Sequence, residues 1–309
     1  MESMMSTVAE GFRLGQVEEM VPVAGGFSND LWHVTTSSGD VAVKVMRAHA
    51  GSTGFRDRIE TSFAIEQNAF RAGVPCPEPV PTPEGNALLR VDGLWARAHR
   101  WVDGSSPRPA DHLEDAGELL ARIHRVGAPS VRRIVDHPRD AETWAALAGR
   151  PGVPGELSEQ LLAAAPELAH LGAATAARGP LDAAHADSHG DLDPKNTLLS
   201  RGGLLAVDWD AAGPRPITRE AVTLALDWSA SLEDFRRALT AYTAASGASL
   251  PGEPWVLGGW VEALSDWLAF NVEQRADSEL GAHEASQACS RLRALASDLD
   301  EYVAALDTV

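Results

Sequence analysis

The chain has 309 residues, 44% of them hydrophobic, and 44 acidic against 26 basic side chains give it a formal net charge of −18 at pH 7. This length and apolar content allow one large or two moderate hydrophobic cores. The negative charge disfavours nucleic acid and anionic membranes as partners, because both require a positive protein face. No stretch reaches the roughly 20 consecutive apolar residues of a membrane span, and the N-terminus lacks a signal-peptide pattern. Only two cysteines, Cys76 and Cys289, are present, so we expect reduced thiols in a cytoplasmic protein.

The first predicted elements are strands and hairpins over residues 12–45. Within them the run 25–30, Gly-Gly-Phe-Ser-Asn-Asp, has glycines that let backbone N–H groups approach an anion closely. Gly26 and the Ser28 hydroxyl are therefore candidate anion contacts. Such a run is also common in ordinary hairpin turns, and it is not a Walker loop because no Gly-Lys-Ser/Thr follows it.

A strand ending in a lysine follows this loop. The alternation Val41-Ala42-Val43-Lys44 places the small Ala42 on the same face as Lys44, which leaves room for a flat ligand beside the ammonium group. The chain has only one other lysine, Lys195.

A helix is predicted from about Asp57 to Ala72, after an irregular insert at 48–54. Glu66 shares the apolar stripe of this helix, so it is the one acid expected to point inward. A buried carboxylate needs a partner, and Lys44 is the obvious cation. Two alternatives stay open: Glu60 could be the partner of Lys44 instead, or Glu66 could be a cap, since spacing alone fixes no contact.

Alternating prolines over 75–83 predict an extended connector, followed by a hairpin of 86–91 and 94–102 that turns at Asp92-Gly93. We place the hinge between two lobes at the end of this hairpin. The predicted domains are therefore 1–102 and 103–309.

The rest of the chain is predicted to be helical. The expected helices are Asp111–Val126, Ala141–Leu147, Leu157–Leu171, Thr218–Trp228, Leu232–Ala245, Pro254–Arg275 and His283–Leu306. In the penultimate helix, Glu262, Asp266 and Glu273 form an acidic stripe beside an apolar one. A solvated face is the ordinary interpretation of such a stripe.

Residues 189–208 carry the strongest chemical signal: His-Gly-Asp-Leu-Asp-Pro-Lys-Asn, an apolar run, Arg-Gly-Gly, a second apolar run, and an aspartate. The apolar runs predict a tight hairpin centred on Gly202, which would place Asn196 and Asp208 opposite each other with Cα atoms about 4.5 to 5.5 Å apart. That is the reach of one metal ion, and Asp191 would hang over the same spot. One carboxylate for a hydroxyl proton and an Asn/Asp pair for Mg²⁺ are the parts of a kinase-type phosphoryl transferase.

This motif, from His189 to Asn196 and then Val207-Asp208-Trp209-Asp210, resembles that of the aminoglycoside phosphotransferase family, the protein-kinase relatives that phosphorylate small molecules. The similarity runs from about Val21 to the end of the chain. It implies an α+β, protein-kinase-like two-lobe fold, with an N-terminal antiparallel sheet lobe of five strands and a mainly helical C-terminal lobe. No Ala-Pro-Glu segment follows Asp208, which argues against a protein substrate.

The resemblance also implies cofactors and residue roles. Mg²⁺ and ATP or GTP would be required, with Asp191 as the catalytic aspartate and Asn196 and Asp208 as the metal ligands. Lys44 would grip the nucleotide phosphates. His189 would shape the catalytic loop by hydrogen bonding. The other nucleotide contacts implied are Gly26, Ser28, Glu66, Arg100 and Val102, the last two through backbone groups that face the base.

By the same resemblance, Asp266, Glu262 and Glu273 would form a carboxylate wall for an amine-bearing substrate. The predicted function is therefore transfer of the nucleotide γ-phosphate to a hydroxyl of a small cationic molecule. Such a molecule could be an aminoglycoside antibiotic, and its modification would then confer resistance. Two alternatives remain open: a kinase of a metabolite (amino alcohol, amino acid or sugar), and a non-catalytic nucleotide-binding scaffold.

Overall fold

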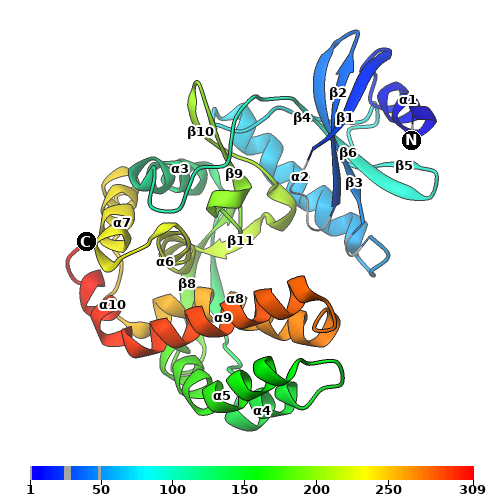
Figure 1. Ribbon diagram of the computed structural model, residues 1–309. Coiled ribbons are helices and arrows are strands. Elements are labelled where there is room, and N and C mark those ends of the chain that lie inside the picture. The colour runs from blue at the N-terminus through cyan, green and yellow to red at the C-terminus, as the bar shows by residue number, and fades with distance from the viewer. Residues whose placement is uncertain (1, 24–28, 48–49) are drawn as a thin grey trace. The chain divides into compact units, whose positions relative to one another are not determined.

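A computed structural model of the protein describes residues 2–23, 29–47 and 50–309. It is a mixed α+β structure, with an antiparallel sheet in the N-terminal part and mostly helices in the C-terminal part, as predicted (Figure 1). The chain forms two compact units. The first unit comprises Met1–Ala128 and Ala186–Pro214, and the second comprises Pro129–His185 and Arg215–Val309. The proposed functional lobes, 1–102 and 103–309, are a different division of the chain and stay a prediction.

An antiparallel sheet of six strands organises the first unit, in the order β1-β2-β3-β6-β4, with β5 also paired to β6. The strands are β1 Val17–Val23, β2 Asn29–Thr36, β3 Gly39–Met46, β4 Pro79–Val80, β5 Leu89–Val91 and β6 Leu94–Arg100. The sequence analysis expected five strands in this sheet, and the described residues form six. The additional strand is β4, which the proline-rich connector contributes at the edge beside β6. An edge position tolerates proline, which has no N–H to donate to a neighbouring strand. The turn at Asp92-Gly93 is confirmed, with φ of 50° and 82°.

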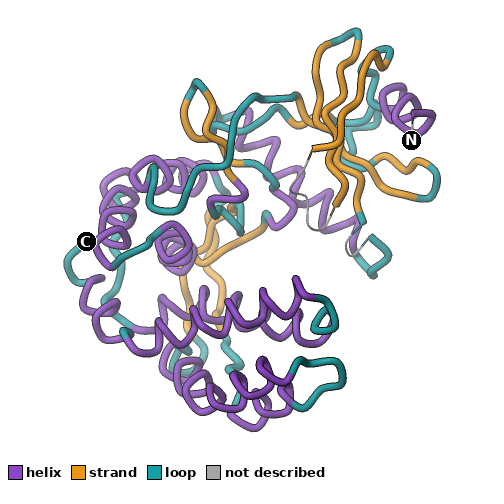
Figure 2. Tube along the Cα trace, viewed as in Figure 1, coloured by secondary structure: helices purple, strands orange, loops and turns teal. Residues whose placement is uncertain are grey.

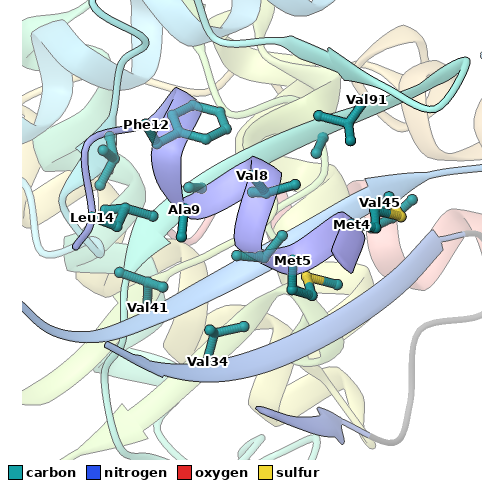
Figure 3. Close-up of a cluster of buried hydrophobic side chains, with 14 residues drawn as sticks. Met4, Met5, Val8, Ala9, Phe12, Leu14, Val34, Val41, Val45 and Val91 are labelled. Carbon is teal, nitrogen blue, oxygen red and sulfur yellow. The ribbon is translucent and has the colours of Figure 1, made fainter. Parts of the chain in front are cut away.

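A helix that the sequence analysis did not predict, α1 (Glu2–Gly11), covers one face of this sheet (Figure 3). Its buried side chains Met5 and Val8 pack in one cluster with Val34 of β2 and Val41 of β3. Val43 and Val45 of β3 belong to the same cluster as Val41. Since side chains alternate between the two faces of a strand, positions 42 and 44 of β3 point to the opposite face. That face carries Lys44.

The first unit is completed by helices and a hairpin. They are α2 Phe55–Arg71, α3 Leu113–Val126, the 3₁₀ turn η1 Pro194–Asn196, β9 Thr197–Ser200, β10 Gly203–Ala206 and the 3₁₀ turn η2 Trp209–Ala211. The two α-helices agree with the predicted ones within two residues at each end.

The second unit is mainly helical (Figure 2). Its helices are α4 Ala141–Ala148, α5 Gly155–Thr175, α6 Ile217–Trp228, α7 Leu232–Ser246, η3 Pro254–Leu257, α8 Gly258–Gln274, α9 Glu279–Ser297 and α10 Leu299–Leu306. In this unit α4 packs on α5, and α8 packs on α9. Two predicted helices are each divided: 254–275 begins with the 3₁₀ turn η3, and 283–306 is interrupted at Asp298. None of the helices in the described residues has the length and apolar content to cross a bilayer.

Apart from the hairpin around Gly202, the sequence analysis expected only helices after residue 102, and this is wrong at three places. Strands β7 Pro129–Ile134, β8 Leu181–Ser188 and β11 Gly213–Pro216 form a small sheet in the order β11-β8-β7. The C-terminal end of β8 leads directly into the His-Gly-Asp motif.

Candidate active site

The hairpin after the catalytic loop forms, but its register differs from the predicted one by one residue. Leu199 pairs with Leu204, so Asn196 lies opposite Val207, whose N–H donates to the Asn196 carbonyl at 2.9 Å. The predicted pairing of Asn196 with Asp208 is therefore wrong. The reason is that the hairpin closes through the two residues Arg201-Gly202 instead of being centred on Gly202. Asp208 follows the strand in a left-handed conformation, with φ and ψ both 61°.

Asp191 and Asn196 are in direct contact, as the motif suggested. The Asn196 Nδ2 donates to Asp191 Oδ2 at 2.7 Å and to the Asp191 carbonyl at 2.9 Å. The loop is held by Asp193, whose Oδ1 accepts the Asn196 N–H at 3.0 Å and caps η1. Because the amide nitrogen is used on Asp191, the Asn196 Oδ1 is the atom available to a cation.

His189 is completely buried and ties the catalytic loop to the strand beyond the hairpin. Its Nε2 contacts the Val207 carbonyl at 2.9 Å, and its Nδ1 lies 3.3 Å from the Asp191 backbone nitrogen. A single tautomer, protonated on Nε2, satisfies both bonds. This geometry fits the structural role expected for His189.

Lys44 extends from β3 to two carboxylates of the η2 region. Its Nζ lies 2.7 Å from Asp208 Oδ1 and 2.5 Å from Asp210 Oδ2. Burial alone would lower the pKa of the Lys44 ammonium, but Asp210 and Asp208 outweigh it and raise the pKa above its usual value. Lys44 is therefore a charged group held beside Asp208, the predicted metal ligand.

Glu66 does point inward from α2, with 1% of its side chain exposed, but it does not pair with Lys44. Its carboxylate binds the Arg97 guanidinium and lies 2.8 Å from His99 Nε2. The expected Lys44–Glu66 pair is wrong because Arg97 stands opposite Lys44 in the β3–β6 register and binds the carboxylate itself. Glu60 is not the alternative partner, since it accepts N–H groups from residues 87 and 88.

Sequence reasoning missed Arg97 and the role of Asp210 as its partner. Arg97 also binds Asp210, so one buried guanidinium bridges α2 and η2. Burial would raise the pKa of Asp210, but Arg97 and Lys44 more than offset this and hold the pKa far below its usual value. The available signal was strand alternation, because in the predicted strand 94–102 an arginine and a histidine two residues apart share one face.

Of the other predicted nucleotide contacts, Arg100 ends β6 and Val102 follows it. Gly26 and Ser28 lie outside the described residues. The Arg100 N–H donates to the Glu78 carbonyl at 2.9 Å, and its side chain donates to the Ser38 carbonyl at 3.2 Å. The next amide, at residue 101, donates to the Asp40 carbonyl at 3.0 Å. Val102 is the next residue with a backbone N–H, and that group has no partner among the described residues.

The acidic stripe of α8 lies in the second unit, and two of its three members line a cavity of about 200 Å³. Glu262 and Asp266 are on the lining, together with Ser265. Glu273 is not, and its carboxylate instead lies 3.5 Å from Arg150. The structure therefore separates Glu273 from the other two acids.

A cation, Arg139, also lines this cavity and donates to Asp266 at 2.8 Å, so the charge of the lining is mixed. A third lining acid, Asp136, accepts from Arg219, which lies outside the lining, on both carboxylate oxygens at 2.7 and 2.6 Å. Partial burial, together with Asp136 and Asp266, raises the pKa of Glu262. Ser265 is 8% exposed, and its hydroxyl has no hydrogen-bond partner among the described residues.

The predicted metal ligands fit a magnesium ion by their chemistry. Mg²⁺ takes hard oxygen ligands and keeps several waters, so one amide oxygen and one carboxylate suffice. Asp208 already binds a cationic group, the Lys44 ammonium. The described residues contain no cluster of three or more His, Cys, Asp and Glu side chains arranged for a metal.

A lysine on a sheet face, a catalytic-loop aspartate bonded to an asparagine, and an aspartate after the next hairpin together define a kinase-type phosphoryl transferase. Residues 19–257 match the phosphotransferase enzyme family. The chain belongs to this family, which confirms the predicted resemblance and the predicted enzyme class.

Relatives in sequence are homoserine kinases. That of Methylobacillus flagellatus is 29% identical over 122 residues, which are 38% of this chain and 36% of the relative. That of Polaromonas naphthalenivorans is 26% identical over 227 residues, 72% of this chain and 69% of the relative. The match thus spans about a third of the first of these kinases.

Solved structures with the same fold include a spectinomycin phosphotransferase in complex with ADP and spectinomycin, with a TM-score of 0.64 and 11% identity over 98% of both chains. A choline/ethanolamine kinase family protein from Mesorhizobium loti has a TM-score of 0.58 and 16% identity, covering 94% of this chain and 93% of that one. A microcompartment-associated aminopropanol kinase has a TM-score of 0.57 and 15% identity, covering 96% and 98%.

Proposed function

We propose that the protein is a cytoplasmic, Mg²⁺-dependent phosphotransferase that moves the γ-phosphate of ATP or GTP to a hydroxyl of a small molecule. The observation that carries this proposal is the pairing of Asp191 with Asn196 in one loop and of Lys44 with Asp208 across the same unit. The ADP in the solved spectinomycin phosphotransferase supports nucleotide use.

Each group has a chemical task in this reaction. Asp191 orients the acceptor hydroxyl and accepts its proton, and the Asn196 amide that donates to it holds the carboxylate in position. Asn196 Oδ1 and Asp208 would hold Mg²⁺, which when bound offsets the negative charge of the phosphates. Lys44 would exchange a carboxylate for phosphate oxygens, and the Val102 N–H would donate to an acceptor atom of the nucleobase.

The proposal is tested by separating binding from transfer. Thermal shift with Mg-ATP, Mg-GTP and nucleotide-free buffer reports donor binding, and release of ADP or GDP reports transfer to each acceptor in a panel of aminoglycosides, amino alcohols, amino acids and sugars. We expect stabilisation by at least one nucleotide and release with at least one acceptor. Stabilisation without release from any acceptor would support the non-catalytic scaffold instead.

We further propose that the cavity of the second unit binds the acceptor, and that the acceptor is a small compound bearing an ammonium group. Its volume of about 200 Å³ lies below the ~300–1,000 Å³ of pockets that hold drug-sized ligands. Glu262 and Asp266 supply negative charge, while Ser265 offers an unpaired hydroxyl. The homoserine kinase relatives support a metabolite over an antibiotic.

Charge-neutral variants of the cavity acids test this assignment. Glu262→Gln and Asp266→Asn should raise the KM for the acceptor about tenfold or more, while the KM for the nucleotide stays unchanged, because each removes one partner of the ammonium group. Glu273→Gln is the matched control, since it lies on the same helix outside the cavity. Equal acceptor KM values in all three variants would contradict the assignment.

A further inference from the structure

Among the described residues, Arg97 is the most deeply buried arginine, with 2% of its side chain exposed. Fully buried arginines are rare unless they are paired, and this one has two carboxylate partners, Glu66 and Asp210. It lies on β6 directly opposite Lys44 of β3, so both cations point to the same face of the sheet. In the kinase-type arrangement the sheet lysine itself pairs with the helix glutamate, and here Arg97 has taken that partner.

These groups belong to one charge cluster, which we define as Lys44, Glu66, Arg97, His99, Asp208 and Asp210. Exposure rises along it. The side chains of Glu66 and Arg97 are 1% and 2% exposed, those of Lys44 and Asp210 are 14% and 21% exposed, and that of Asp208 is 43% exposed. Ion pairs at the dry end are costly to break, whereas those at the wet end can exchange partners with solvent and ligands.

Asp210 is the shared member of the cluster. Its Oδ2 binds Lys44 and its Oδ1 binds Arg97. If Lys44 moved to a phosphate without Arg97 in place, Asp210 would be left as an unpaired carboxylate in a mostly buried position. That state is strongly unfavourable, so Asp210 would retain Lys44 and compete with the nucleotide.

We propose that Arg97 is a positioning residue of the nucleotide site: it serves as the permanent counter-ion of Glu66 and Asp210, so that Lys44 and Asp208 can leave each other for the phosphates and the metal of Mg-nucleotide. The inference rests on the proposed function. It assigns the exchangeable charge to Lys44 and the fixed charge to Arg97, a division of roles that a single lysine–glutamate pair does not provide.

Arg97→Lys tests the proposal, because it retains the positive charge but replaces two separate donor nitrogens, Nη2 on Glu66 and Nη1 on Asp210, by a single ammonium nitrogen at the end of a shorter side chain. Calorimetric titration should show Mg-ADP binding weakened tenfold or more, while the acceptor KM stays within twofold of wild type. Arg90→Lys is the matched control, an exposed arginine on the neighbouring strand β5, and should bind Mg-ADP as wild type does.

The lysine content of the chain allows a second readout that does not depend on activity. Because Lys44 and Lys195 are the only lysines, NMR spectra of protein labelled with ¹³C at the lysine ε-carbon contain two side-chain signals. The signal that disappears in Lys195→Arg belongs to Lys195, so the other belongs to Lys44. Saturating Mg-ADP should move the Lys44 signal in the wild type. Arg97→Lys adds a third lysine signal, which comparison with the wild-type spectrum identifies. The Lys44 signal should move less at saturation in this variant, because Asp210 retains the Lys44 ammonium group.

A double-variant comparison completes the test. In an Asp210→Asn background the competing carboxylate is gone, so Arg97→Lys should change Mg-ADP affinity less than twofold. Should Arg97→Lys not fold alone, Asp210→Asn carries the test, and it should bind Mg-ADP at least as tightly as wild type; a loss greater than threefold overturns the proposal.

Two other results have separate meanings. Wild-type affinity and an unchanged Lys44 shift in folded Arg97→Lys would make Arg97 a purely structural residue and overturn the inference alone. Failure of the wild-type protein to bind any Mg-nucleotide would overturn the proposed function itself.

Discussion

Replacing Asp191 by alanine should separate turnover from folding in this protein. Asp191 is exposed, and its carboxylate accepts one hydrogen bond, from Asn196 Nδ2 at 2.7 Å. The amide keeps its second acceptor, the Asp191 carbonyl at 2.9 Å, which the substitution does not remove. We therefore expect a loss of only about 1 kcal/mol in the free energy of unfolding, the contribution of one hydrogen bond.

The expected effect on catalysis is much larger. A positioned general base contributes about 10²–10⁴-fold in rate, which corresponds to roughly 3–5 kcal/mol of barrier. Turnover should fall by that factor, while the Kd for Mg-nucleotide stays within about twofold, because the carboxylate serves the acceptor and not the donor.

The assay combines product release under saturating substrates, calorimetric binding of Mg-ADP and urea unfolding on the same preparation. Asp193→Ala is the control: it removes the cap on the Asn196 N–H and costs about 1 kcal/mol of stability, but should lower turnover by less than about 10²-fold. A turnover within tenfold of wild type in Asp191→Ala would refute the assignment of the base.

Three further outcomes are expected. Met5→Ala should cost about 2–5 kcal/mol in urea unfolding, because the side chain is buried under the sheet, whereas the exposed Ser6→Ala should stay within about 0.5 kcal/mol. Burial alone would raise the pKa of Asp136, but hydrogen bonds from the Arg219 side chain and the Ala177 N–H lower this pKa below its usual value. The stability that ionised Asp136 contributes is therefore present above the unfolded pKa of about 3.9 and lost as the pH falls through the folded pKa. Asp136→Asn should lower the free energy of unfolding by about 3 kcal/mol at pH 7 and by progressively less below about pH 4. A difference between variant and wild type that stays constant with pH would contradict the pairing. Burial raises the pKa of the thiols of Cys76 and Cys289 to about 12 and about 11, so a thiol reagent at pH 8 should label neither before urea unfolds the chain, and prompt labelling would show the thiols to be accessible.

Local patterns in the sequence predicted the helices well, because an amphipathic stripe is a property of neighbouring residues. Helices α2 and α3 begin and end within two residues of the predicted positions. Strand β7 was missed because its side chains are mostly exposed, including Val131 at 74%, so it has no alternation of buried and exposed positions to detect. The broken C-terminal helices continue the same stripe across the break, so periodicity alone does not reveal it.

The contacts of the site depend on residues that are far apart in the sequence, which local patterns do not reveal. The motif brought Asp191 and Asn196 together correctly, but two adjacent glycines allowed two hairpin registers, and the sequence does not distinguish them. The partner of a buried acid is a tertiary property. Glu66 was correctly expected to need a cation, yet the choice between Lys44 and Arg97 depends on strand register and reach across the sheet.

The division of the chain into units has an evolutionary consequence. Every described residue assigned to phosphate donation lies in the first unit, whereas the cavity acids lie in the second, and the polypeptide passes from one unit to the other at three points. On the proposed assignment of the cavity to the acceptor, mutations that change the choice of acceptor can therefore accumulate without disturbing the residues proposed to bind the donor. A hybrid in which 129–185 and 215–309 come from a relative with another acceptor should inherit its specificity while keeping the nucleotide preference of this chain.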